Sequence, residues 1–192
     1  MQETEIGHFS VTINNKTFKL LPSLRNMSTL ANSVRILLIY EMIHSPMVPL
    51  WYRIDLARDI ILACCDDNDI DEHLIYCRKC KPRLSIKKIS INDQIVVAAA
   101  LMRHGVAGVN RPDYDGSKKG SGKPADKFDV NKIVADAMIY FGLSKQEALD
   151  LTMSEFCYLL AAKFPPTASQ NNSPSLEDHK AAMKALMEKG NV

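Results

Sequence analysis

Four cysteines in the first half of the chain are of the right type to hold a metal ion. Two residues separate Cys77 from Cys80, a spacing at which both thiolates can bind one zinc ion, and Cys64, Cys65 and His73 lie nearby in the sequence. Cys64 and Cys65 are adjacent, however, and we expect them at a helix end, where neighbouring side chains diverge. We therefore favour buried helix thiols and two incidental loop cysteines over a zinc site, and we expect no metal and no cofactor.

Three further patterns look like chemical sites but fail on spacing or context. The acidic run 66–72 lacks the glycine that a calcium loop needs, and Glu72 stands at its turn position. Residues 116–124 are faintly like a phosphate loop, but Pro124 replaces the Ser or Thr that binds Mg²⁺, and no strand precedes it. His104 is explained by a helix end, and no motif ties a serine or cysteine to it. We predict that the protein is not an enzyme.

The overall charge is nearly balanced. Among the 192 residues, 24 are Lys or Arg and 22 are Asp or Glu, which gives a formal net charge of +2. Hydrophobic residues make up 46% of the chain. This balance argues against a wholly basic nucleic-acid coat protein and against an acidic disordered chain. The composition is that of an ordinary globular protein with one domain, or one domain and a small second one.

Nothing in the sequence indicates export or a membrane segment. The five cysteines include one that cannot be paired, and no basic stretch followed by an apolar one marks the N-terminus as a signal peptide. The apolar stretches fall well short of the roughly 20 residues that span a bilayer. We expect a protein of a reducing cytoplasm, with no transmembrane helix.

Local patterns predict an N-terminal hairpin followed by helices. Apolar and polar residues alternate on both sides of Asn14 and Asn15, which tolerate the positive φ of a tight turn. Capping residues and three- to four-residue apolar spacing then predict helices, and Gly105 is the expected end of the last one. The predicted elements of this half are a hairpin over 9–20 and helices over 34–45, 49–65 and 90–105.

A second helical unit follows a segment rich in Gly, Pro, Ser and Lys. Asp129 is placed to cap its first helix. Two capping boxes come next, Ser144 with Glu147 and Thr152 with Glu155, and they predict a very short helix followed by a longer one. The unit resembles a helix-turn-helix, but its last helix offers few groups that read bases, so a helix pair that docks on protein fits better. The basic cluster over 78–88 leaves nonspecific nucleic-acid binding open.

These elements define the expected fold, which is mainly α with a small N-terminal β-hairpin and has two α-helical units joined by a flexible linker. We predict a hairpin and helical domain over 1–106, a linker over 107–127, a small helix-turn-helix-like domain over 128–164, and a second linker with a C-terminal amphipathic helix over 165–192.

Three segments of the chain together resemble tail assembly chaperones of long-tailed bacteriophages. They are residues 21–30 (LPSLRNMSTL), 99–108 (AALMRHGVAG) and 141–156 (FGLSKQEALDLTMSEF). The resemblance spans most of residues 7–164, and its most widely shared part is the third segment. It implies a non-enzymatic assembly factor of the host cytoplasm that coats the long helical tape measure protein and keeps it soluble. Such a factor is displaced as tail tube subunits polymerise, and self-association is a further expectation.

Apolar stripes on the helices are the candidate surface for such a partner. Grooves between helices that carry Met and aromatic side chains adapt to varied helical partners. An apolar stripe is more often core, and we favour that role before Pro165, whereas core and binding are about equally favoured in the tail. The candidates are Met138, Phe141, Met153, Phe156, Leu159 and Phe164 in the second unit, and Leu176, Met183 and Met187 in the tail.

Two other functions remain open from the sequence. One is a structural neck or tail adaptor that stays in the finished virion. The other is a small zinc-stabilised protein that binds nucleic acid, with Cys64, Cys65, Cys77 and Cys80 as the candidate ligands. We expect the tape measure protein as the partner, and neither a membrane nor a nucleic acid.

Overall fold

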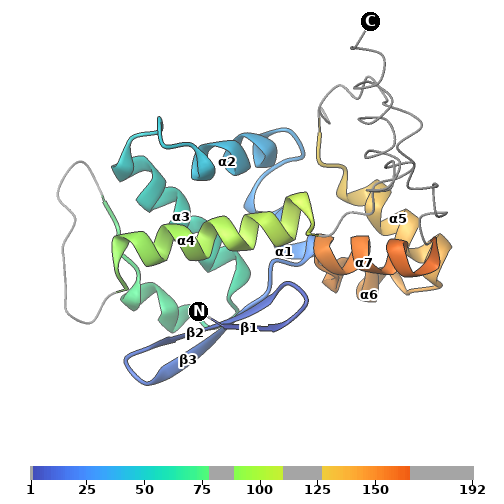
Figure 1. Ribbon diagram of the computed structural model, residues 1–192, viewed down its shortest axis with the longest axis horizontal. Coiled ribbons are helices and arrows are strands. Elements are labelled where there is room, and N and C mark those ends of the chain that lie inside the picture. The colour runs from blue at the N-terminus through green and yellow to red at the C-terminus, as the bar shows by residue number, and fades with distance from the viewer. Residues whose placement is uncertain (1, 78–88, 110–126, 165–192) are drawn as a thin grey trace, which may run out of the picture.

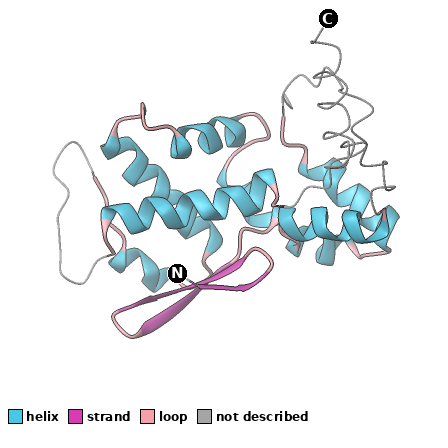
Figure 2. Cartoon of the chain, viewed as in Figure 1, coloured by secondary structure: helices cyan, strands magenta, loops and turns pink. Residues whose placement is uncertain are grey.

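The computed structural model describes residues 2–77, 89–109 and 127–164 and is mainly helical, with β-strands only at the N-terminus of this part (Figures 1 and 2). The elements are β1 (Gln2–Glu5), β2 (His8–Ile13), β3 (Lys16–Leu20), α1 (Leu24–Leu30), α2 (Arg35–His44), α3 (Leu50–Cys64), the 3₁₀-helix η1 (Asn68–His73), α4 (Ile91–Met102), the π-helix η2 (Arg103–Ala107), α5 (Val130–Phe141), α6 (Lys145–Asp150) and α7 (Met153–Lys163). The predicted fold class, mainly α with a small N-terminal β-hairpin, is confirmed. Most of the predicted linker over 107–127, and the predicted second linker and C-terminal helix over 165–192, lie outside the described residues.

The predicted hairpin is formed by β2 and β3, which pair antiparallel. Asn14 and Asn15 both adopt positive φ, 50° and 66°, in the turn between the two strands, as a tight hairpin turn requires. The sequence did not predict β1, which pairs antiparallel with β2 and makes the sheet three-stranded. One face of the sheet is buried, and its apolar residues join the hydrophobic core.

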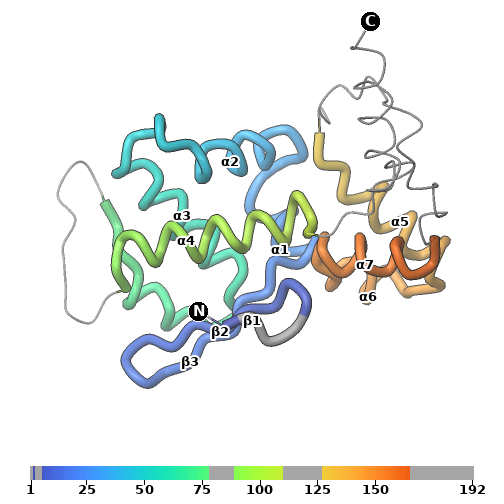
Figure 3. The backbone as a smooth tube through the Cα atoms, in the orientation of Figure 1, coloured from blue at the N-terminus to red at the C-terminus, as the bar shows by residue number. Residues whose placement is uncertain are grey.

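Three helices of the first unit, α2, α3 and α4, begin near the predicted residues, and α2 and α3 also end near them. The Asn32 side chain accepts a hydrogen bond from the amide of Arg35 at 2.9 Å, and Ser45 ends α2. α3 starts after Pro49 and ends at Cys64. Ser90 caps α4 through the amide of Asp93. Figure 3 shows how α2, α3 and α4 lie against one another above the sheet.

One buried polar side chain fixes α4 in this packing. Gln94 is fully buried, and its amide nitrogen donates to the carbonyls of Ile54 and Ile75, both at 3.0 Å. Its carbonyl oxygen accepts from the Ile75 amide at 2.7 Å. A buried polar group is costly unless it forms hydrogen bonds, so breaking these contacts is unfavourable. Through them, Gln94 of α4 holds Ile75, which follows η1, and Ile54 of α3 in place.

The expected helix end at Gly105 is wrong. The helix continues past Met102 as η2, and Gly108, with φ of 74°, ends it. Gly105 is buried, and a Cβ atom there would lie 2.8 Å from Met27 Sδ. The glycine is therefore present because α1 packs closely against η2, and not because the backbone must reverse. The sequence also did not predict α1, which Ser23 caps through the amide of Asn26.

Both predicted capping boxes are present in the second unit. Ser144 and Glu147 exchange side-chain and backbone hydrogen bonds at the start of α6, and Thr152 and Glu155 do the same at the start of α7. Gly142, with φ of 70°, ends α5 and allows the chain to turn into α6.

The two helical units share one hydrophobic core within the described residues. α5, α6 and α7 gather at one end of the molecule, and α1 lies between them and the rest of the first unit (Figure 1). Ala137, Ala148 and Cys157 of the second unit belong to the same buried cluster as the helices of the first. Among the described residues, no helix is both long and apolar enough to cross a membrane.

Candidate functional site

The three sequence segments 21–30, 99–108 and 141–156 meet where the two units join. Segment 21–30 contains α1, segment 99–108 contains the end of α4 and η2, and segment 141–156 contains α6 and the start of α7. The amide of Leu24 donates to the carbonyl of Leu151 at 2.8 Å, and Ser23 forms a β-bridge with Thr152. Arg25 Nε donates to Asp150 at 2.9 Å. We call this region the junction.

Side chains on α7 hold the junction from its other side. The Ser154 hydroxyl is fully buried, accepts from the Val109 amide at 3.0 Å and lies 3.1 Å from His104 Nδ1. His8 Nε2 of the sheet lies 3.0 Å from Glu155 Oε1. Ser154 is buried and His104 is half-buried, and their contact positions η2 against α7.

A groove opens beside the junction, with a cavity volume of about 400 Å³. Its walls come from α2, η2, α5 and α7, so both helical units contribute to it. The residues that line it are Leu37, Val106, Lys127, Phe128, Asp129, Lys132, Ile133, Asp136, Tyr140, Met153, Phe156 and Leu160. The amide of Phe128 donates to the carbonyl of Ser33 at 2.8 Å and fixes the start of the second unit beside α2.

The floor of the groove is apolar. Met153 and Phe156 are almost completely buried, and Leu37, Ile133 and Leu160 pack against the core while remaining partly exposed. The ring of Phe156 makes an edge contact with the ring of Phe141 behind it. A floor of this kind gains free energy when an apolar side chain enters and displaces water.

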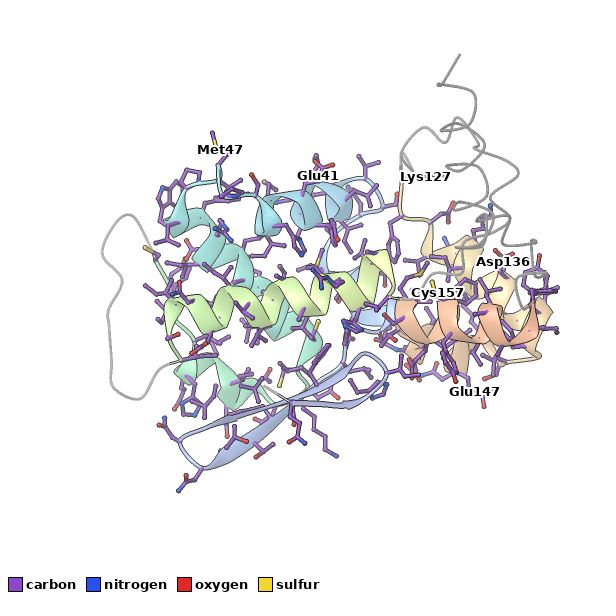
Figure 4. The ribbon with its side chains drawn as sticks, in the orientation of Figure 1. Glu41, Met47, Lys127, Asp136, Glu147 and Cys157 are labelled. Atoms are coloured by element: carbon purple, nitrogen blue, oxygen red, sulfur yellow. The ribbon has the colours of Figure 1, made fainter. Side chains whose placement is uncertain are left out.

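The rim of the groove is charged on the α5 side only. Lys127 Nζ lies 3.1 Å from Asp129, and this hydrogen bond holds the pKa of the Asp129 carboxyl below its usual value, as does the amide of Lys132. Lys132, Asp136 and Tyr140 follow at intervals of four residues along α5. Figure 4 labels Lys127 and Asp136 on this part of the chain.

The predicted binding residues are not all on one surface. Met153 and Phe156 form the groove floor, whereas Met138 and Phe164 are 41% and 42% exposed outside it. Phe141 and Leu159 are partly buried and do not line the groove. The three tail candidates, Leu176, Met183 and Met187, lie outside the described residues.

Several residues of the groove were not predicted as site residues. Leu37 and Val106 come from the first unit, and the sequence alone did not show that the two units touch. Ile133, Tyr140 and Leu160 lie in predicted helices, and a helical wheel that compared α5 with α7 would have found them on facing sides. The carboxylate of Asp136 gave no signal, because a single acidic residue on a helix is ordinary.

The cysteines do not form a metal site in the described part of the chain. No group of three or more His, Cys, Asp or Glu side chains able to hold a metal ion occurs there. Cys64, Cys65 and Cys77 are buried, and burial raises the pKa of the Cys64 and Cys65 thiols. Because zinc binds the thiolate, raised pKa values oppose zinc binding at these two residues. Cys80 lies outside the described residues.

Comparison with known protein families identifies a match over the helical part of the chain. Residues 21–181 match a family described as "Family of unknown function (DUF6246)". The chain belongs to this family. The DUF6246 match begins one residue after β3 ends, and it includes the three junction segments and every residue that lines the groove. No curated protein and no solved structure matches the chain.

Proposed function

We propose that this protein is a phage tail assembly chaperone that binds helical segments of the tape measure protein and keeps them soluble. The observation that carries the proposal is the groove with an apolar floor between α2, η2, α5 and α7. The proposal is also supported by the three sequence segments that resemble tail assembly chaperones. The fold brings these segments together beside the groove.

The size of the groove suits the side chains of a helix. A volume of about 400 Å³ lies near the lower end of ligand pockets, so it holds a few anchoring side chains and not the body of a helix. An amphipathic helix presents such anchors at positions i, i+3 or i+4, and i+7. Met153 in the floor can change rotamer at low cost, which suits a chaperone that meets many similar segments of one long partner.

Release also follows from this arrangement. A groove that takes a few side chains buries much less surface than a stable protein complex, so each contact is weak on its own. Many copies of the chaperone would coat one tape measure protein, and growing tail tube subunits would displace them one at a time.

Co-expression with the tape measure protein of the same genome tests the proposal. We expect the tape measure protein to become soluble with this chain, and a complex to elute in size-exclusion chromatography. The variant Tyr140→Ala, which trims the groove wall, should reduce the soluble fraction. The matched control Ile139→Ala changes a neighbouring side chain that is 75% exposed and does not line the groove, so it should bind normally.

Two results would contradict the proposal. One is a tape measure protein that is no more soluble with the wild-type chain than without it, and that forms no complex. The other is a stoichiometric amount of this chain in purified virions, which would favour a neck or tail adaptor that remains in the particle over a chaperone that is displaced.

A further inference from the structure

The geometry of the groove points to a specific partner chemistry: it selects an amphipathic helix with a basic residue beside its apolar stripe, and Asp136 binds that basic residue. This inference rests on the proposed function, because it describes the segment that the same groove binds. It goes further by naming the charge that the segment must carry and the residue that recognises it.

Asp136 lies in the middle of the charged rim that α5 contributes to the groove. Residues four positions apart on a helix lie almost in line, so Lys132, Asp136 and Tyr140 form one row along α5, and all three line the groove. The facing walls supply Leu37 from α2 and Leu160 from α7, which have no charge. A bound helix therefore meets charge along one edge only, and that edge lies beside its apolar face.

Of the carboxylates Asp129 and Asp136 on this charged rim, Asp136 is the one that remains available to bind a partner. Asp129 is already used, because it pairs with Lys127 and accepts a hydrogen bond from the amide of Lys132 at the start of α5. Across residues 2–77, 89–109 and 127–164, no hydrogen bond or ion pair joins the Asp136 side chain to another residue.

The two charged residues of the row respond differently when a helix covers them. Lys132 is exposed, and its long side chain can keep the ammonium group in water. Asp136 is half-buried, and its short side chain cannot move away from a helix that covers the groove. A covered carboxylate without a cation loses hydration that nothing replaces, whereas a Lys or Arg on the partner restores the interaction. Asp136 thus rejects neutral and acidic helices more than it strengthens basic ones.

The row also sets the length of the recognised segment. From Lys132 to Tyr140 the helix rises by about 12 Å, which is a little over two helical turns. A partner segment of similar length places two or three apolar anchors over the floor and one flanking position opposite Asp136. We expect Lys or Arg at that flanking position.

A displayed library of helical peptides tests this inference without the tape measure protein. The peptides carry fixed apolar residues at i, i+3, i+4 and i+7 and randomised flanking positions, and they are selected on the full-length chain. Binders should be enriched in Lys or Arg at one flanking position. The variant Asp136→Lys should weaken these binders by about tenfold and shift the selection to Asp or Glu at the same position. Asp136→Asn should remove the preference without reversing it.

A charge reversal outside the groove is the control. Glu41 lies exposed on α2 and does not line the groove (Figure 4). Because Glu41→Lys also replaces a carboxylate by Lys, it changes the net charge as much as Asp136→Lys does. It should leave the selected sequences unchanged. Circular dichroism of both variants checks that the total helix content is unchanged.

The outcomes separate the two proposals. Binders without a basic preference, or a preference that Asp136→Lys leaves unchanged, would overturn the inference even if the tape measure protein is solubilised. Basic helices that bind the wild-type chain and lose affinity with Asp136→Lys would support it even if the tape measure protein is not solubilised. A library that yields no binder to the wild-type chain would also overturn it.

Discussion

The contact between Gly105 and Met27 allows a quantitative test of the junction. A methyl group on Gly105 would lie 2.8 Å from Met27 Sδ, 2.9 Å from Met27 Cγ and 3.0 Å from Pro22 Cβ. Favourable contacts between carbon atoms occur at about 3.5–4.0 Å, so all three distances are repulsive. Met27 is fully buried and cannot swing into solvent to relieve them. Gly105→Ala should therefore force α1 and η2 apart.

The expected loss of stability follows from two opposing effects. Overpacking of a buried site costs about 1–3 kcal/mol. Alanine is better than glycine in a helix by roughly 0.5–1 kcal/mol, and this gain applies because Gly105 does not have positive φ. The net destabilisation should be about 1–2 kcal/mol, which lowers the melting temperature of a protein of this size by about 2–8 °C. Urea unfolding followed by circular dichroism measures it.

A double-mutant cycle identifies the cause. Met27→Ala alone should cost about 2–5 kcal/mol because it leaves a cavity. When Met27→Ala is combined with Gly105→Ala, the new methyl group fills part of that cavity. The double variant should therefore be about 1 kcal/mol more stable than the sum of the single effects predicts.

Gly142→Ala is the control, since its Cβ would meet nothing within 4 Å and its cost comes from a φ of 70°. Gly142→Ala and Met27→Ala should be additive. A Gly105→Ala variant as stable as the wild type, or an additive cycle for Gly105 and Met27, would refute the packing argument.

Three further variants test other parts of the fold. Gln94→Leu leaves the buried Ile75 amide without its acceptor and should cost about 2–3 kcal/mol in urea unfolding. Hydrogen bonds from Ser144 lower the pKa of the Glu147 carboxyl, so its contribution to stability is present above the unfolded pKa of about 4.3 and is lost as the pH falls through the lower folded value. Glu147→Gln should therefore flatten the acid limb of a plot of melting temperature against pH, and an unchanged limb would contradict this. Asn15→Val places a β-branched residue at a φ of 66° and should cost about 1–2 kcal/mol, measured by thermal unfolding against Asn15→Gly, which should be tolerated.

Elements that depend on neighbours in the sequence were predicted well. Asn14 and Asn15 adopt the turn conformation that their side chains tolerate, and the caps at Ser90, Ser144 and Thr152 all form. A cap joins a side chain to a backbone amide three residues away, so the sequence contains both partners. For the same reason, the ends of α2 and α3 lie close to the predicted residues.

Elements that depend on distant contacts were not predicted. Gly105 has the sequence context of a helix end, and only the presence of Met27 against it shows that it is a packing glycine. α1 is short and has a weak apolar period, but Leu24 and Met27 are completely buried because α3, α6 and η2 pack against α1. Propensity cannot report a contact between residues far apart in the chain.

The groove was predicted in part for the same reason. Met153 and Phe156 were candidates because they lie in a helix with an apolar stripe, and they form its floor. Leu37 and Val106 could not be assigned, because their place in the groove depends on how the second unit docks on the first. The linear sequence showed a second unit and left its contacts with the first undetermined.

The bridge between Ser23 and Thr152 has a consequence for biosynthesis. α1 is translated early, but the residues that complete its environment are among the last of the described chain to leave the ribosome. Until then Leu24 and Met27 lack part of their cover, and the nascent chain carries an unfinished core. The groove receives Leu160 from α7 at the end of this process. The groove that we propose for a partner helix therefore takes its final form only after translation has passed α7.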